Sequence, residues 1–161
     1  MPEKPKFINV RGNLLDISVP RVSGIINITP DSFYSGSRFM TEAEIVRTAF
    51  DMIVEGADII DVGGYSSRPG AEDISEEEEK KRVLNAVKLI SREMPEAIIS
   101  VDTFRSEVAK EAVYDCGAGM INDITAGEAD PRMYSVIESL NVPYDDAHAG
   151  EPADNAGQPC V

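Results

Sequence analysis

The sequence predicts an α/β protein built on a parallel sheet, and three observations support this prediction. Short apolar segments alternate four times with longer amphipathic segments over most of the 161 residues. The apolar segments are rich in isoleucine and valine and do not alternate with polar residues, as expected for strands covered on both faces. Three of the four amphipathic segments begin at a capping residue, and all four end at glycine or before proline. The alternation therefore predicts a parallel sheet with helices outside it.

The chain begins with a predicted β-hairpin over Phe7–Val19. Two β-prone runs there are separated by Gly12-Asn13, a pair typical of tight hairpin turns. The first strand of the parallel sheet is expected over Val22–Ile28, which is short and apolar.

The first helix is predicted from about Thr41 to Glu55. Thr41 and Glu44 have the spacing of a capping box, and Gly56 can adopt the left-handed conformation that ends a helix. The apolar residues that repeat every four positions are Ile45, Ala49 and Ile53.

The second unit combines a strand over Ala57–Val62 with a helix that starts at Ser75 and stops before Pro95. Ser75 and Glu78 again fit a capping box. The residues expected to be buried are Val83, Val87, Ile90 and Met94. Six carboxylates occur in the eight residues Glu72–Glu79, and we interpret them as a solvated helix start favoured by the helix dipole rather than as a metal site.

The last two units follow the same pattern. Strands are predicted over Ala97–Val101 and Ala118–Asn122, and helices over Arg105–Cys116 and from Asp130 to before Pro143. Gly117 would end the third helix, and Pro131 fits the first position of the fourth.

Composition changes after Tyr144. Residues 145–161 hold four acidic residues, no Lys or Arg, and little that could be buried, so we predict a domain over residues 1–144 followed by an irregular tail that could be non-native. The whole chain has a formal net charge of −14, which argues against nucleic-acid and membrane-surface partners. Two isolated cysteines and the absence of a signal or transmembrane segment predict a cytoplasmic protein.

Polar residues fall where the four predicted strands end: Asn27, Asp61, Asp102 and Asn122. The carboxyl ends of parallel strands meet at one edge of a sheet, so these side chains are expected to share a polar floor. A carboxylate beside a carboxamide can meet the donors and acceptors of an amino-pyrimidinone ring, the carboxylate by accepting and the amide by both donating and accepting. The alternative is that each side chain only caps the following loop.

The loop Gly63–Gly70 combines glycines, two hydroxyl groups and Arg68, which suits an anion through N–H, O–H and guanidinium donors. An ordinary connecting loop of Gly, Ser and Pro remains the alternative. Asn27 offers a carbonyl oxygen to a hard cation such as Mg²⁺, which takes few protein ligands and fills its shell with phosphate and water.

Four segments in this order and spacing resemble dihydropteroate synthases. They are GIINITPDSF (24–33), GADIIDVGGYSSRPGA (56–71), ISVDT (99–103) and GAGMINDI (117–124), and the resemblance extends over about residues 7–144. It implies a TIM (β/α)8 barrel, of which this chain would hold the first four to five βα units after the N-terminal hairpin. It also implies that 4-aminobenzoate and (7,8-dihydropterin-6-yl)methyl diphosphate are condensed to dihydropteroate and pyrophosphate in folate biosynthesis, with Mg²⁺. A homodimer is compatible with it.

The resemblance also implies site residues. Asn27 would contact magnesium, and Asp61, Asp102 and Asn122 would bind the pterin. Asp31 and Arg68 would take part in catalysis. The remaining substrate-binding positions would be Phe33 in the mobile first loop, and Ser67 and Pro69 in the second. Ser67 stands where the family usually has Thr, and Ser35-Gly36-Ser37 replaces a more acidic stretch.

The resemblance ends near residue 144, and the Asp, Lys and Arg-x-His groups that the family places in later strands have no match here, so the chain is expected to be truncated. His148 is interpreted as a residue of the tail. Two alternatives to an active synthase are therefore a non-catalytic pterin-binding fragment and a pterin-dependent methyltransferase relative.

Overall fold

A computed structural model of the chain describes residues 6–29, 40–66 and 73–146. It contains a five-stranded parallel sheet in the order β3-β4-β5-β6-β7 and a separate antiparallel hairpin, β1–β2. The sheet strands are β3 (Ser23–Asn27), β4 (Ile59–Gly63), β5 (Ile98–Asp102), β6 (Met120–Asn122) and β7 (Tyr144–Asp145). The predicted α/β class is confirmed, with four βα units and the strand of a fifth.

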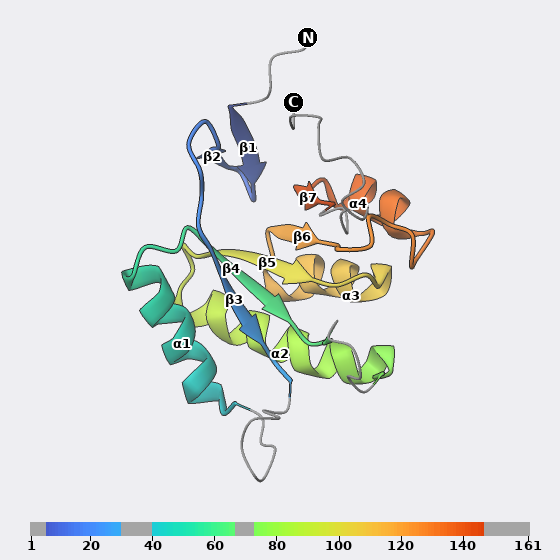
Figure 1. Cartoon of the computed structure of the whole chain (residues 1–161), viewed down its shortest axis with the longest axis horizontal. Helices are drawn as coiled ribbons and strands as arrows, with labels where there is room; N and C mark the ends of the chain where they lie inside the picture. The colour runs from blue at the N-terminus through green and yellow to red at the C-terminus, as the bar shows by residue number, and fades with distance from the viewer. Residues whose placement is uncertain (1–5, 30–39, 67–72, 147–161) are drawn as a thin grey trace, which may run out of the picture.

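The helices follow the strands in strict alternation. They are α1 (Glu42–Val54), α2 (Glu76–Glu93), α3 (Ser106–Glu111), which continues as a π-helical turn (Ala112–Cys116), and α4 (Met133–Leu140). Sequential strands are neighbours in the sheet, and right-handed crossovers then place every helix on the same face. Figure 1 shows this layer of helices along the sheet, with the hairpin set apart from it. Within the described ranges, the opposite face carries no helix.

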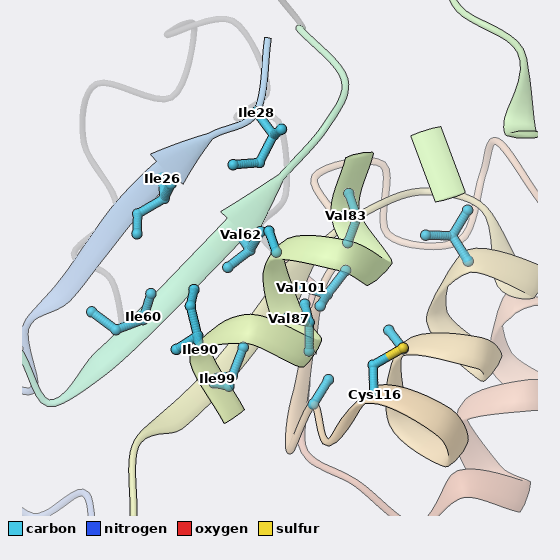
Figure 2. Packing of buried hydrophobic residues seen from close by; sticks show 14 of the residues in the cluster. Ile26, Ile28, Ile60, Val62, Val83, Val87, Ile90, Ile99, Val101 and Cys116 are labelled. Carbon is cyan, nitrogen blue, oxygen red and sulfur yellow. The ribbon is translucent and has the colours of Figure 1, made fainter. Parts of the chain in front are cut away.

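The core lies between the sheet and its helices. Side chains of alternate strand residues point to this face, and Figure 2 shows them packed against α2. The buried apolar residues of the strands are Ile26, Ile60, Val62, Ile99, Val101 and Ile121, with Ile28 directly after β3, and those of α2 are Val83, Ala86, Val87, Leu89 and Ile90. Because alternate residues face opposite ways, the residues between them in the strands are left for the other face.

The hairpin turn lies one residue earlier than the sequence predicted. β1 (Phe7–Val10) pairs with β2 (Asn13–Asp16), so the two turn residues are Arg11 and Gly12 rather than Gly12 and Asn13. Both have positive φ, 52° and 87°, as a type I′ turn requires. Asn13 begins the second strand instead, while the side chain of Asn9 accepts a hydrogen bond from the backbone N–H of Gly12.

The hairpin packs against the start of β6. Val10 is 3% exposed, and the Arg11 guanidinium donates a hydrogen bond of 2.8 Å to the carbonyl of Gly117. A Cβ at Gly119 would lie 2.7 Å from Val10 Cγ1, so this position has no room for a side chain. The hairpin therefore closes the amino-terminal end of the sheet, away from the strand ends that carry the polar residues.

Gly119→Ala is expected to lower the free energy of unfolding by about 1–3 kcal/mol, because the added methyl group would overlap Val10. Urea titration of the wild type and three variants, Gly119→Ala, Val10→Ala and the double substitution, measures the effect and its origin. The double variant should lose less than the sum of the two single losses, since alanine at position 10 removes the clash. Additive losses would contradict close packing between these residues.

The predicted starts of the first two helices are confirmed. Thr41 and Glu44 form the complete capping box of α1. Ser75 accepts a hydrogen bond from the backbone N–H of Glu78 at the start of α2, but the Glu78 carboxylate pairs with Arg82 at 2.8 Å. The ends before Pro95 and at Gly117 are also confirmed.

The fourth helix begins later than predicted, at Met133 rather than near Asp130. The Asp130 carboxylate accepts hydrogen bonds from the backbone N–H and the hydroxyl of Ser106, at 3.0 and 2.6 Å. Asp130 thus serves the first turn of α3, a segment 24 residues earlier in the chain. These hydrogen bonds, against the effect of burial, hold the pKa of Asp130 well below its usual range.

The described chain ends just after β7. Tyr144 pairs in parallel with Ile121 and Asp145 with Asn122, so the last strand extends one residue past the predicted domain boundary. Residues 147–161, which include His148 and most of the predicted tail, lie outside the described residues. In the parts of the chain that are described, no helix is both long and apolar enough to cross a membrane.

Candidate functional site

A row of polar residues crosses the carboxyl ends of the strands on the face opposite the helices. The strand register places Asn27 beside Gly63, Gly63 beside Asp102, Asp102 beside Asn122, and Asn122 beside Asp145. Residues in register on neighbouring strands point to the same face of a sheet. The row therefore gathers residues from five separate segments of the chain.

Asp61 lies in β4, two residues before Gly63. Its side chain therefore points to the same face of the sheet as the row. Asn122 Nδ2 donates a hydrogen bond of 3.0 Å to Asp61 Oδ2, and Asp61 is only 5% exposed. The predicted polar residues Asn27, Asp61, Asp102 and Asn122 are thus on one face, and two of them are in direct contact.

Gly63 leaves the centre of this row open. A Cβ at this position would lie 3.3 Å from Asn27 Oδ1 and 3.4 Å from Asp102 Oδ2. The two oxygen atoms therefore border the same backbone segment, and a side chain here would crowd both. The missing side chain lets the amide of β3 and the carboxylate of β5 both come close to the backbone of β4.

Two buried oxygen atoms of this polar floor accept no hydrogen bond from the described residues. Asp61 Oδ1 and Asn122 Oδ1 are buried and have no hydrogen-bond partner in the described part of the chain. An unmet buried acceptor costs about 1–3 kcal/mol, so a guest with N–H groups would recover this free energy. The sequence predicts that the Asn122 amide both donates and accepts toward a ligand; in the structure one of its two N–H groups donates to Asp61, and its oxygen is one of the unmet acceptors.

Asp102 has an altered acidity. Burial, and to a smaller extent the nearby carboxylates of Asp61, Glu79 and Asp123, raise its pKa to about 6. Near neutral pH this carboxyl group is therefore charged, at a cost in free energy. A guest that donates hydrogen bonds to it would reduce this cost.

Asp102→Asn is expected to stabilise the protein near pH 8 by about 1–2 kcal/mol, after discounting for partial exposure. A raised pKa means that the folded state binds more protons between pH 3.8 and about 6, so wild-type stability falls as pH rises through this window. The gain should vanish near pH 4, where the wild-type carboxyl group is protonated. Urea midpoints at pH 4 and pH 8 check this. An equal gain at both values would contradict the assignment.

A second group of buried polar residues lies next to the row and includes Glu79. The sequence analysis interpreted the acidic residues 72–79 as solvated, and this is wrong for Glu79. Glu79 is fully buried (0% exposed) rather than solvated. The Thr103 hydroxyl donates to Glu79 Oε1 at 2.6 Å, and Arg105 Nη1 contacts Oε2 at 2.7 Å. Burial raises the pKa of Glu79, against the effects of Thr103 and Arg105. A signal was present, because Glu79 precedes the buried Val83 by four residues.

Arg105 connects the ends of two loops. Its guanidinium lies 5.1 Å from the centre of the Phe104 ring and 5.6 Å from that of Tyr65, and these rings pack edge to face. Its Nη2 also donates to the carbonyl of Ile74 at 2.6 Å. Residues after β4, before α2 and after β5 therefore meet at one side chain. Sequence reasoning treated Arg105 only as a helix start.

Asp123 organises the loop after β6. Its carboxylate accepts hydrogen bonds from the backbone and hydroxyl of Thr125, the backbone of Gly127 and the hydroxyl of Tyr144. Asp123 is 0% exposed, and each of these bonds measures 2.7–3.0 Å. Burial and this bond raise the pKa of Tyr144. The loop that follows Asn122 is therefore held in place from the side of the next strand.

The other predicted site residues lie outside the described residues: Asp31, Phe33, Ser67, Arg68 and Pro69.

Convergent polar groups at the carboxyl ends of a parallel α/β sheet are typical of the small-molecule sites of barrel and other α/β enzymes. A family model described as pterin binding enzyme matches residues 23–158, which is most of the chain. The chain belongs to this family of pterin-binding enzymes.

Known relatives are dihydropteroate synthases. The dihydropteroate synthase of Bacillus subtilis (strain 168) is 48% identical over 122 residues, which are 76% of this chain and 42% of the relative. The Xanthomonas albilineans dihydropteroate synthase with 4-aminobenzoic acid superimposes with a TM-score of 0.76 at 38% identity, over 86% of this chain and 50% of that one. The same enzyme in complex with 7,8-dihydropteroate gives a TM-score of 0.71 at 36% identity.

These comparisons confirm the predicted family resemblance and the TIM-barrel fold class. The five parallel strands correspond to part of such a barrel. The chain spans about two fifths of the Bacillus subtilis relative and about half of the Xanthomonas albilineans enzyme.

Proposed function

We propose that this chain carries the pterin-binding part of a dihydropteroate synthase, which joins 4-aminobenzoate to (7,8-dihydropterin-6-yl)methyl diphosphate and releases pyrophosphate in folate biosynthesis. The observation that carries the proposal is the floor of unmet acceptors beside Asp102, formed by Asp61 and Asn122. A pterin ring presents several N–H donors along one edge and would satisfy them. Relatives and solved structures with matching names support the choice of reaction.

The chemistry of the proposed reaction fits the charges of the floor. As the bond to the leaving diphosphate breaks, positive charge grows on the methylene carbon attached to the pterin. Carboxylates fixed under the ring, Asp61 and Asp102, stabilise this charge because they need not reorient as it develops. Asp31 and Arg68, as catalytic residues, and Phe33, Ser67 and Pro69, as aminobenzoate and diphosphate contacts, remain proposals from the family resemblance.

Magnesium is part of the proposal and rests on the donor set. Asn27 Oδ1 and Asp102 Oδ2 border the open position at Gly63, and hard oxygen atoms of this kind suit Mg²⁺. Among the described residues there is no cluster of three or more His, Cys, Asp or Glu arranged for a metal, so most of the ion's shell would come from substrate and water. We propose Asn27 as the protein ligand. When bound, magnesium would neutralise charge on the leaving diphosphate. A cytoplasmic location and a homodimer are proposed with the same function.

Two measurements test the proposal. Calorimetric titration of the chain with the pterin diphosphate and Mg²⁺ should show binding that Asn122→Ala weakens, and an assay for pteroate formation with 4-aminobenzoate tests for turnover. Binding without turnover would support the second candidate, a pterin-binding module. It is favoured by the match to about half of the structural relatives. A folded chain that binds no pterin would overturn both candidates.

A further inference from the structure

Glu79 is a charged residue on a buried helix face that is otherwise apolar. It precedes Val83 and Val87 on α2 by four and eight residues, and all three side chains are fully buried. Figure 2 shows the two valines within the core. An apolar residue at position 79 would continue this face without the cost of removing a carboxylate from water. The charge at this position therefore points to a role other than packing.

Both oxygen atoms of the Glu79 carboxylate are bonded. Oε1 accepts a hydrogen bond of 2.6 Å from the Thr103 hydroxyl, and Oε2 pairs with Arg105 Nη1 at 2.7 Å. The Thr103 hydroxyl itself accepts from the backbone N–H of Arg105 at 3.2 Å, so its own hydrogen needs an acceptor. A carboxylate accepts at both ends, whereas the amide of a glutamine would place its NH2 group against one of the two donors.

Thr103 connects this carboxylate to the row at the strand ends. It directly follows Asp102, the last residue of β5, and its backbone N–H donates a hydrogen bond of 3.0 Å to the carbonyl of Asn122 at the end of β6. The side chain of Thr103 is bonded to α2, on the helix side of the sheet, while Asp102 faces the row. Glu79 therefore ties the ends of β5 and β6 to α2 through a single residue.

The end of β4 also lies against Glu79. A Cβ at Gly64, directly after this strand, would lie 3.5 Å from Glu79 Cγ. The guanidinium of Arg105, bonded to the same carboxylate, donates to the carbonyl of Ile74 just before α2 at 2.6 Å. The carboxylate thus has bonded or packed neighbours from the segments after β4 and β5 and before α2, and it has no freedom to move independently of them.

We propose that Glu79 is a positioning residue that acts through Thr103 to fix the ends of β5 and β6, so that Asp102 and Asn122 keep the spacing that a pterin guest requires. This inference rests on the proposed function, since it assumes a pterin at the row. Glu79 lies on the helix side of the sheet and does not touch the guest. Its effect on affinity arises because hydrogen bonds to the guest weaken steeply with small displacements of their acceptors.

Titration calorimetry with (7,8-dihydropterin-6-yl)methyl diphosphate and Mg²⁺ tests the proposal on variants checked for folding by circular dichroism. Thr103→Val keeps the shape but cannot donate to Glu79, and it is expected to weaken binding about 10-fold. Thr103→Ser keeps the hydroxyl and should bind nearly as tightly as the wild type. Ile90→Val is the control: it lowers stability by removing a buried methylene group from α2 and should leave the affinity unchanged.

A double-variant cycle asks whether Thr103 acts through Glu79. Glu79→Met fills similar space without an acceptor and should weaken binding as Thr103→Val does. Adding Thr103→Val to Glu79→Met should then cost little further affinity, because the contact is already lost.

Three results would overturn the inference and leave the proposed function standing. They are wild-type affinity in Thr103→Val, a loss in Thr103→Ser or Ile90→Val as large as that in Thr103→Val, and additive losses in the double variant. A folded wild-type chain that binds no pterin would overturn the proposed function and this inference together.

Hydrogen exchange provides a readout without a guest. The Thr103 amide, which donates to Asn122, should exchange faster in Glu79→Met than in the wild type. The Ile121 amide, which donates to the carbonyl of Pro143 on the other side of β6, should change much less. Equal acceleration of both amides would show a general loss of stability and would contradict a positioning role for Glu79.

Discussion

Replacing Arg105 by alanine is expected to lower the free energy of unfolding by about 3–5 kcal/mol, the largest loss we expect from a single substitution. The loss is large because the substitution leaves the buried carboxylate of Glu79 without its ion-pair partner. Glu79 is fully buried and would keep its charge without the guanidinium that contacts it at 2.7 Å. The substitution also removes the hydrogen bond to Ile74 and the packing on the Phe104 and Tyr65 rings.

Urea unfolding of matched variants separates these contributions. Arg92→Ala removes an exposed arginine that pairs with its neighbour Glu93 at 2.8 Å, and should change stability by less than about 0.5 kcal/mol. Glu79→Gln combined with Arg105→Ala should be more stable than Arg105→Ala alone, because no buried charge is left unpaired. The loss in Arg105→Ala should shrink at low pH, where Glu79, whose pKa burial already raises, takes up a proton. A loss that matches that of Arg92→Ala would contradict a buried ion pair.

Asp102→Asn is expected to weaken binding of the proposed pterin guest by about 100-fold. A charged acceptor contributes about 1.5–3 kcal/mol per hydrogen bond, and the neutral amide loses this charge and points an N–H group toward the donors of the ring. Titration calorimetry at pH 8 measures the effect. The isosteric control is Asp115→Asn, which removes an exposed charge from the π-helical turn after α3 rather than from the row.

Asp102→Asn should raise the free energy of unfolding near neutral pH while it lowers the affinity for the pterin. Such opposite effects are expected for a carboxyl group whose pKa burial raises to about 6 and whose charge is stabilised only when a ligand binds. If Asp102→Asn changes the affinity by less than threefold, the carboxylate does not contact the guest, and the pterin would have to bind elsewhere on the row.

Local signals predicted most of the elements of the fold. The capping residues Thr41 and Ser75 are where the sequence placed them, because a helix start depends on hydrogen bonds within four residues. The parallel strands follow from short apolar runs between helices. The errors have nonlocal causes. Asp130 has the sequence of a cap for α4, and its Oδ1 accepts from the backbone N–H of Arg132, but its Oδ2 accepts from Ser106 on α3 and the helix begins only at Met133.

The polar strand ends Asn27, Asp102 and Asn122 were also predicted from sequence, since strand ends in an α/β protein lie along one edge, whereas Asp61, predicted as a strand end, lies in the middle of β4. Their hydrogen bonds were not. Nothing in the spacing of Asp61 and Asn122, which are 61 residues apart, shows that the amide nitrogen of one is bonded to the other. The same holds for Glu79, whose burial could be inferred from helical periodicity but whose partner Arg105 could not.

The sequence by itself determined the order of helices and strands, the apolar face of each, and the residue types at the strand ends, because period, caps and turns act over a few residues. Tertiary structure alone decided which of these polar groups became partners and which stayed unmet. Register between strands places Asp102 beside Asn122 and, across β5, brings Asp61 to the same amide. Hydrogen bonds depend on distances of a few tenths of an ångström, and only the packed sheet sets distances between segments so far apart in the chain.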